Sequence, residues 1–378
     1  MQLTFLRPLL DSAGPFASVY LDTSATDRGP TDVQALQVRW REQRAELEKE
    51  LADPATLDAL GEVLTGPQAL GAPGMAAFGR DGTVPLAVRL PDVPRREQAR
   101  WSQLPDLLPL LVQAPPRPPY LLVSATRAGG EVLVVGGAGE NTREEVQGTG
   151  WPVHKTKVGG WSQDRYQRSA EEAWETNAKE LADAVTHATG GHPAEAVIVA
   201  GDVRARELLV EKLPDDLQRK VIMVDRELPV DSEELTQAAE QALQQLEDDD
   251  CRRRLDTWRS QAGTGRAVEG LAETVATLRD GEVAELFLGG DYRSRDRDVP
   301  GPRWAGTGAY VGPGLADIGL TEDELRERLV DRIVPDLIDA ALVRAAAGTD
   351  AELFVVPPDQ PSLRDDIGAL LRFAVPGA

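Results

Sequence analysis

The stretch from Trp151 to Ser169 gathers positive charge around two glycines and an aromatic side chain. Its cations are Lys155, Lys157, Arg165 and Arg168. Asp164 is the single acid among them, so four positive charges minus one negative charge leave a balance of +3. Cations beside an aromatic ring suit the phosphates and bases of RNA. The stretch therefore predicts RNA binding, and the alternative is an ordinary loop in which Trp161 folds back on its own domain.

Two glycines, Gly159 and Gly160, stand directly before Trp161 in this stretch. Glycine is typical of positions where the backbone must be mobile or must come very close to another surface. We therefore expect a loop whose backbone is mobile or approaches a partner closely, with an exposed Trp161 beside it.

Residues for other common chemistries are scarce. The three histidines, His154, His187 and His192, are not spaced as a helical pair, and no carboxylate is obviously placed to complete a site with them. Cys251 is the single cysteine, which excludes an internal disulfide and any cysteine-based zinc or iron–sulfur site. The run Gly136–Gly139 lacks the Lys-Ser/Thr ending of a phosphate loop and predicts only a turn. We expect no catalytic residues, no metal and no cofactor.

The overall charge makes the basic stretch stand out. The 378 residues include 41 Lys and Arg against 63 Asp and Glu, a formal net charge of −22. Such a surface repels phosphate backbones, so nucleic-acid binding requires a local exception. No apolar run approaches the ~18 residues of a membrane span, so the chain is expected to be soluble. A single cysteine fits a reducing compartment, so we expect a cytoplasmic protein.

The elements that must position the basic stretch follow it in the chain. Apolar residues at helical spacing predict a helix from about Asp164 to Thr189. A buried strand is expected at Ala196–Ala200, a helix capped by Asp202 after it, and a second buried strand at Lys220–Val224. This alternation predicts a mostly parallel α/β sheet.

A proline-rich segment, Ala114–Pro119, marks the first domain boundary, because four prolines in five residues exclude a helix interior or a central strand. We expect three domains, an α+β domain at 1–115, a middle domain at 118–230 and an α/β sandwich at 231–378. In the last of these, residues 325–347 are expected to be helical and residues 292–314 to form an inserted loop or mini-domain.

The basic stretch resembles a known motif. Gly159-Gly-Trp-Ser-Gln-Asp-Arg-Tyr-Gln-Arg168 is similar to the Gly-Gly-Gln-Ser-x-x-Arg-Phe-x-Arg segment of the archaeal and eukaryotic class-one peptide chain release factors, where it also precedes the long helix of the middle domain. Segments beginning at Gly265, Leu278 and Ile367 look like the last domain of that family. The resemblance covers about residues 118–378. It implies a release-factor-like middle domain and a C-terminal domain with an L7Ae-like fold.

Two departures from that family bear on activity. Its Gln positions the water that hydrolyses peptidyl-tRNA, whereas here Trp161 stands in that place, and an indole donates one hydrogen bond and accepts none. Its stop-codon motifs use asparagine and cysteine in the N-terminal domain, whereas this chain has only Asn141, Asn177 and Cys251, all outside residues 1–115. We therefore expect neither hydrolysis nor codon reading.

The resemblance extends to the bacterial branch of the family, which includes the hibernation factor Balon. It implies a non-catalytic ribosome-binding factor of the stress or hibernation type that occupies the ribosomal A site, with the glycine loop near the peptidyl-transferase centre. Gly159 and Gly160 would let the backbone enter a narrow channel, Trp161 would stack or wedge there, and the four cations would contact ribosomal RNA. The C-terminal domain would face elongation factor Tu or another translational GTPase.

Two other functions stay open at this point. The chain could be an enzyme that rescues stalled ribosomes by cleaving peptidyl-tRNA, with Gln163 or another group replacing the missing Gln. Alternatively, it could be an acidic cytosolic scaffold that binds only proteins.

Overall fold

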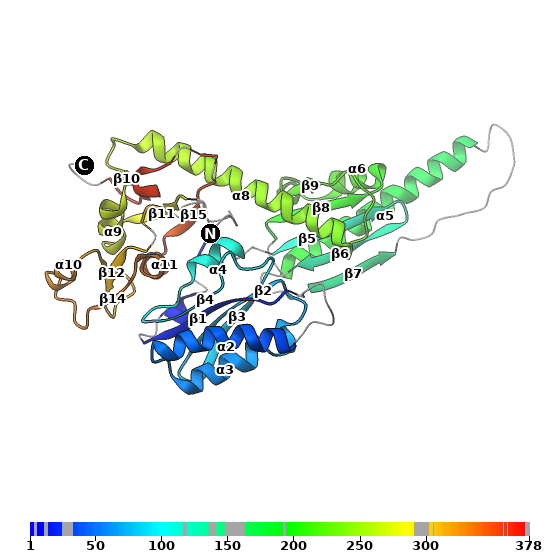
Figure 1. Cartoon of the computed structure of the whole chain (residues 1–378). Coiled ribbons are helices and arrows are strands. Elements are labelled where there is room, and N and C mark those ends of the chain that lie inside the picture. Colours follow the sequence, from blue (N-terminus) through cyan, green and yellow to red (C-terminus); the bar gives the residue numbers. More distant parts are fainter. Residues whose placement is uncertain are drawn as a thin grey trace. The chain divides into compact units, whose positions relative to one another are not determined.

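The computed structural model describes most of the chain, and its described residues fall into two compact units. The described ranges are residues 1–3, 6–10, 14–24, 33–115, 119–135, 141–147, 163–191, 194–290, 302–304, 306–357, 359–360 and 362–374. One unit comprises residues 1–115 with 250–378, and the other comprises residues 116–249. Helices and strands alternate in both units, which confirms the α/β class (Figure 1).

Residues 116–249 form a five-stranded sheet in the order β7-β6-β5-β8-β9. The strands are β5 (Tyr120–Thr126), β6 (Gly129–Val135), β7 (Asn141–Gln147), β8 (Ala196–Gly201) and β9 (Val221–Met223). β8 pairs in parallel with both β5 and β9, whereas β6 pairs antiparallel with β5 and β7. The predicted strand–helix–strand unit is confirmed by the parallel pair β8 and β9. The sheet as a whole is mixed, with two parallel and two antiparallel pairs, because a turn of two residues after β5 folds the chain straight back into β6.

Helices cover both faces of this sheet. The helices are α5 (Gln163–Gly191), α6 (Val203–Lys212), α7 (Asp215–Gln218) and the start of α8 (Glu233–Gln261). Leu181 and Val185 of α5 pack with Val123 on one face, and Leu235 of α8 packs with Leu122 on the other. Successive strand residues point to opposite faces, so Leu122 and Val123 serve separate cores. The predicted helix from Asp164 to Thr189 is confirmed by α5. β9 lies at the sheet edge and is only half-buried, not buried as predicted.

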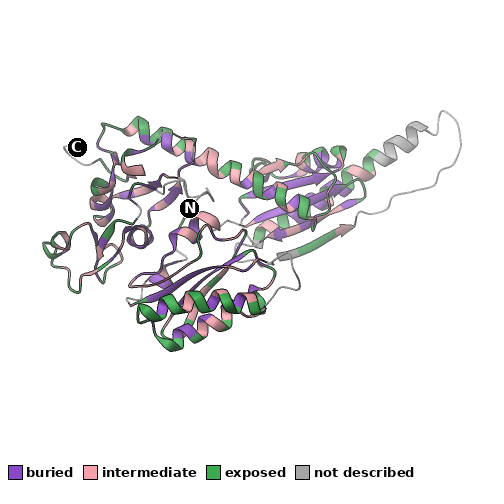
Figure 2. Cartoon of the chain, viewed as in Figure 1, coloured by how far each residue is buried: buried purple, intermediate pink, exposed green. Residues whose placement is uncertain are grey.

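Residues 1–115 form an antiparallel sheet in the order β3-β2-β1-β4. Its strands are β1 (Phe16–Asp22), β2 (Gly74–Arg80), β3 (Thr83–Leu90) and β4 (Gln98–Ser102), and its helices are α1 (Arg7–Leu10), α2 (Val33–Lys49), α3 (Pro54–Leu64) and α4 (Leu108–Gln113). α2 and α3 pack on the sheet face that carries Val19 and Ala77, and their outer faces are exposed (Figure 2). The opposite face carries Phe16 and Phe78.

Residues 250–378 contain two further sheets, ordered β10-β16-β11-β15 and β13-β12-β14. The elements are β10 (Ala267–Glu269), α9 (Leu271–Arg279), β11 (Val283–Leu288), β12 (Gly308–Val311), β13 (Ile318–Gly319), α10 (Glu322–Arg326), β14 (Val334–Leu337), α11 (Ile338–Gly348), β15 (Glu352–Val355) and β16 (Ile367–Leu371). One prediction is wrong here, because residues 325–347 include strand β14 as well as helix α11. Strand β12 lies within residues 292–314 and pairs with β13 and β14 in the small sheet.

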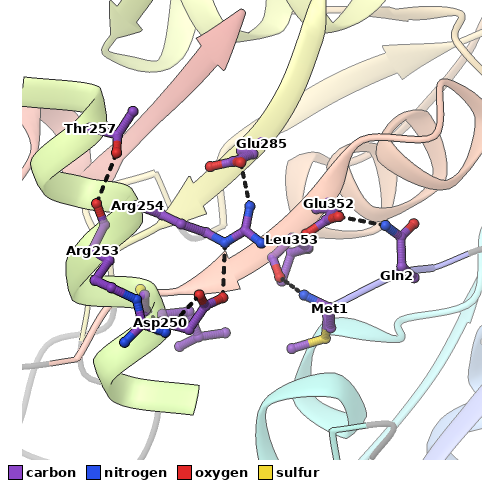
Figure 3. A network of polar contacts seen from close by, with 11 residues as sticks. Met1, Gln2, Asp250, Arg253, Arg254, Thr257, Glu285, Glu352 and Leu353 are labelled. Atoms are coloured by element: carbon purple, nitrogen blue, oxygen red, sulfur yellow. Dashed lines mark hydrogen bonds and ion pairs between the residues drawn. The ribbon is translucent and has the colours of Figure 1, made fainter. Parts of the chain in front are cut away.

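The second half of α8 is held on the first of these sheets by a polar network (Figure 3). Arg254 pairs with Asp250 at 2.8 Å and with Glu285, and its guanidinium lies 4.7 Å from the centre of the Phe354 ring. At the edge of the same sheet the Met1 amine donates to the Leu353 carbonyl at 2.6 Å. The first residues of the chain are thus packed against residues 250–378.

A single hydrophobic core joins the two parts of this unit. Phe16, Phe78 and Leu107 of the first part are buried in the same cluster as Ile338 and Leu342 of α11. Residues 1–115 and 250–378 therefore behave as one packed body, although more than a hundred residues separate them in the chain.

Candidate functional site

The structure places two of the predicted RNA-binding residues. Arg165 and Arg168 lie on the first two turns of α5 (Gln163–Gly191). Lys155, Lys157, Gly159, Gly160 and Trp161 lie outside the described residues. The basic stretch thus leads directly into a helix of 29 residues that packs on the sheet of residues 116–249, and its contacts with RNA stay a prediction.

Arg127, in the turn between β5 and β6, fixes α5 to that sheet. Its guanidinium lies 4.7 Å from the centre of the Trp174 ring and forms an ion pair with Asp202 at 3.1 Å. Its carbonyl oxygen accepts a hydrogen bond from the Asn177 side chain at 2.9 Å. We call Arg127, Trp174, Asn177 and Asp202 the Arg127 cluster. It connects three elements, namely the turn, α5 and the start of α6.

Asp202 has a second role in the Arg127 cluster, because it caps α6. Its carboxylate accepts hydrogen bonds from the backbone of Arg204 at 3.0 Å and of Ala205 at 3.1 Å. Burial alone would raise the pKa of Asp202, but the hydrogen bonds from Arg127 and from the α6 backbone outweigh it and hold the pKa below its usual value. Asp202 is therefore ionised at neutral pH and keeps Arg127 in place under the Trp174 ring.

Gly130 allows α5 to lie close to β6. A Cβ atom at this position would lie 2.7 Å from the Leu181 side chain and 2.5 Å from the Ser124 carbonyl oxygen. The absence of a side chain therefore lets the buried face of α5 reach the sheet.

The positive charge at the start of α5 ends abruptly. Between residues 171 and 183 the charged residues of the helix are Glu171, Glu172, Glu175, Lys179, Glu180 and Asp183. Five acids against one base continue a helix that begins with Arg165 and Arg168. Attraction for phosphate is therefore confined to the first turns of α5 and the stretch before them.

A shallow groove lies at the carboxyl ends of β5 and β8, beside the Arg127 cluster. Its lining includes Ser124, Thr126, Arg127, Glu131, Asp202 and Glu227. Ligands of α/β sheets often bind at such a switch point between neighbouring parallel strands. Here three acids line the groove and Arg127 is already paired, so the groove does not suit a phosphate. Sequence reasoning missed it, although polar residues directly after two parallel strands could have indicated it.

Metal-ligating residues are not clustered in the described ranges. Within them, no group of three or more His, Cys, Asp or Glu residues is placed to hold a metal ion. His187 is exposed on α5, and His154 and His192 lie outside the described residues. Cys251 is buried, with its sulfur 3.7 Å from the Val355 carbonyl oxygen. Among the helices of the described ranges, none has the length and apolar character needed to span a bilayer.

The Arg127 cluster leads to a prediction about stability. Arg127→Ala removes a cation–π contact and an ion pair, and we expect the free energy of unfolding to fall by about 1–2 kcal/mol. Urea denaturation followed by circular dichroism measures this change. Arg204→Ala is the matched control, because Arg204 makes only an exposed pair with Glu207 on α6. Equal stability of the two variants would show that Arg127 does not secure α5.

Comparison with known proteins gives matches of two kinds. The profile of bacterial archaeo-eukaryotic release factor family 2 matches residues 119–264. Two uncharacterized proteins of Mycobacterium tuberculosis, MT2704 of strain CDC 1551 / Oshkosh and Rv2629 of strain H37Rv, are each 30% identical to this chain over 377 residues, covering 98% of it and 96% of the relative. These relatives match the chain over nearly its whole length.

Solved structures with some likeness include three archaeal proteins. Translation termination factor aRF1 is 16% identical, with a TM-score of 0.25 over 98% of this chain and 97% of its own. Pelota of Archaeoglobus fulgidus is 14% identical, with a TM-score of 0.34 over 80% of each chain. Ribosome-bound archaeal Pelota is 12% identical, with a TM-score of 0.38 over 99% of this chain and 94% of its own.

Proposed function

This chain belongs to bacterial archaeo-eukaryotic release factor family 2, and from that membership we propose that it is a ribosome-associated translation factor that does not hydrolyse peptidyl-tRNA. The observation that carries the proposal is the junction at Gln163, where the basic stretch becomes α5. The Arg127 cluster fixes the body of α5, and the basic residues that open this helix in the sequence would meet the partner.

Ribosomal RNA is the partner that fits this charge distribution. A chain with a net charge of −22 gains little electrostatic binding free energy from RNA except at its basic stretch, which contains Lys155, Lys157, Arg165 and Arg168. The amino end of α5 adds the positive end of a helix dipole, which favours phosphate oxygens. The stretch is thus suited to bind phosphates over a small area.

We further propose that the protein binds in the ribosomal A site and acts on idle ribosomes. In the release-factor arrangement the glycine loop reaches the peptidyl-transferase centre from the A site. A factor that fills this site without cleaving its tRNA would protect an idle ribosome, so we propose a role in hibernation or stress. The likeness to Balon and the contact of residues 231–378 with elongation factor Tu or another translational GTPase stay predictions, as does the division into three domains.

The second candidate is a peptidyl-tRNA hydrolase that rescues stalled ribosomes. Gln163 favours it, because this amide is the first residue of α5 and stands two positions after Trp161. An amide can both donate to and accept from a water molecule, unlike an indole. The third candidate, a scaffold that binds only proteins, gives no reason for the basic stretch.

Trp161 provides the test that separates these functions. We expect the wild-type protein to sediment with ribosomes and to leave peptidyl-tRNA on them uncleaved, because an indole offers neither an acceptor for water nor a base. Ribosome pelleting and a peptide-release assay measure the two properties. Release clearly above the ribosome-only background would establish the hydrolase instead, and absence from the ribosome pellet would favour the scaffold.

Variants of Trp161 extend this test. Trp161→Ala should reduce ribosome affinity by about 1–3 kcal/mol if the ring stacks on a base, and Trp161→Phe should restore most of the loss. Trp161→Gln recreates Gly-Gly-Gln, but we expect little release, because catalysis needs the loop held to within roughly 0.5 Å of a productive geometry.

A further inference from the structure

A largely buried group of three carboxyl groups and one guanidinium lies where residues 1–115 meet residues 250–378. Its members are Arg100, Asp106, Asp336 and Asp339, which we call the Asp106 cluster. Arg100 on β4 pairs with Asp336 on β14 at 3.0 Å, and the Asp336 side chain has no exposed surface. The other Asp336 oxygen accepts a hydrogen bond from the Leu104 backbone at 2.8 Å. Asp336 thus fastens the first part of the unit to the second.

Asp106 is only 7% exposed and is tied to the sheet of residues 1–115. Its backbone nitrogen donates to the Ser18 hydroxyl at 3.0 Å, and its carbonyl oxygen accepts from the Tyr20 hydroxyl at 2.6 Å. One carboxylate oxygen accepts from the Gln98 amide at 3.1 Å. The other is buried and has no hydrogen-bond partner among the described residues. Such an oxygen is costly when charged, because neither water nor a donor compensates it.

The charges in this cluster do not balance. With all three carboxyl groups ionised, three negative charges and one guanidinium would leave two negative charges in a largely buried space. Burial, followed by the charge of Asp339, raises the pKa of Asp106 to about 6, with Arg100 opposing and Asp336 adding to the rise. Burial likewise raises the pKa values of Asp336 and Asp339.

Among the described residues, Arg100 is the positive charge that acts on Asp106. Arg344 of α11 instead donates to the carbonyl oxygens of Gly312 at 3.0 Å and Pro313 at 2.9 Å. β1 contributes Tyr20, whose pKa burial and Asp106 raise well above its usual value, so it stays neutral. β4 contributes only Gln98 and Arg100, and α4 (Leu108–Gln113) carries no charged residue. Arg7 on α1 pairs with Asp350, beyond the far end of α11 from Asp339.

A proton is the cation that remains to balance the cluster. No group of three or more acids in the described ranges is placed to hold a metal ion. A proton on Asp106 removes one of the excess charges, and its O–H group lies in the interior that joins the two parts of the unit.

We propose that the Asp106 cluster is a proton-operated clamp, in which uptake of a proton at Asp106 tightens the junction between residues 1–115 and residues 250–378 as the pH falls. The direction follows from linkage. The Asp106 carboxyl group binds its proton more tightly in the folded chain than in the unfolded chain, where its pKa is near 3.8. Its contribution to stability is therefore full below about pH 4 and is lost as the pH rises through about 6.

The experiment compares the wild type with Asp106→Asn, which imitates the protonated side chain. Between about pH 5 and about pH 7.5 the folding equilibrium constant of the wild type should fall roughly tenfold because of this one group. The same loss should be missing in Asp106→Asn, which should be the more stable protein at the higher pH. Urea denaturation at a series of pH values gives these equilibria. Asp81→Asn is the matched control, because the Asp81 side chain is 79% exposed, and its curve should run parallel to that of the wild type.

Hydrogen exchange locates the effect at the junction. After correction for intrinsic rates, peptides around Leu104 and Asp336 should be better protected at the lower pH in the wild type and equally protected at both pH values in Asp106→Asn. Parallel stability curves for wild type and Asp106→Asn would overturn the clamp. If Asp106→Asn does not fold, Asp339→Asn provides the test. Removal of the Asp339 charge must lower the pH at which the protein loses stability as Asp106 ionises. An unchanged pH for this loss overturns the proposal.

Discussion

Replacement of Lys155, Lys157, Arg165 and Arg168 by alanine is expected to weaken ribosome binding by roughly 100- to 1,000-fold at about 0.15 M salt. Each cation that neutralises a phosphate releases counterions, and each lost contact lowers the slope of log affinity against log salt by roughly 0.7–0.9. Four lost contacts therefore lower the slope by about three. Pelleting with purified ribosomes at several salt concentrations measures both the affinity and the slope.

The control for this variant must change the net charge equally at other places. Arg41, Lys49, Arg253 and Arg326 are exposed cations in the unit formed by residues 1–115 and 250–378. Lys49, Arg253 and Arg326 make only exposed pairs within their own helices. Alanine at these four positions should leave the salt slope nearly unchanged. If both fourfold variants lose affinity alike, general charge and not the basic stretch governs binding.

Elements with short-range causes could be predicted from the sequence. α5 follows from apolar residues at helical spacing, such as Leu181 and Val185, which pack on one sheet face. The hairpin of β2 and β3 follows from Asp81-Gly82, because both residues adopt positive φ values, 48° and 72°, as a tight two-residue turn requires. In these cases the residues that determine the structure are close together in the chain.

The pairing of strands with partners far away in the sequence could not be predicted. Pro335 of β14 is a local signal against a helix interior, but it does not show the partner strand, which is β12, where Ala309 lies opposite Asp336. Leu329 and Arg332 have φ values of 60° and 56°, which end any helix before β14. No local pattern shows that these two residues adopt such values.

The candidate site divides in the same way. The basic stretch is a matter of composition and is visible in the sequence. The Arg127 cluster is not, because Arg127 meets Asp202 across 75 positions and Asn177 across 50. The Asp106 cluster is still less visible, since Arg100 and Asp336 are 236 positions apart. The sequence therefore predicts which residues bind a partner, and only the fold shows which residues hold α5 on its sheet.

Valine at both Gly159 and Gly160 is expected to reduce ribosome binding to background while the melting temperature stays within about 2 °C of the wild type. A backbone that enters a narrow channel has no room for two branched side chains, and a positive φ would add strain. A surface loop contributes little to a core, so substitutions there usually change stability by less than about 0.5 kcal/mol, or roughly 1–2 °C in a chain of this size. Pelleting and thermal denaturation measure the two effects.

Glycines elsewhere in the chain supply both controls for this experiment. At Gly190 and Gly308 a Cβ atom would meet nothing within 4 Å, so valine at both positions should preserve ribosome binding. At Gly201, with a φ of 120°, a Cβ atom would collide with the backbone of Ala125, so Gly201→Val should lower the melting temperature strongly. If Gly159 and Gly160 are needed for folding, their double valine variant should melt at a lowered temperature, as Gly201→Val does. If they are needed for ribosome binding, the variant should be as stable as the Gly190 and Gly308 variant but should not bind.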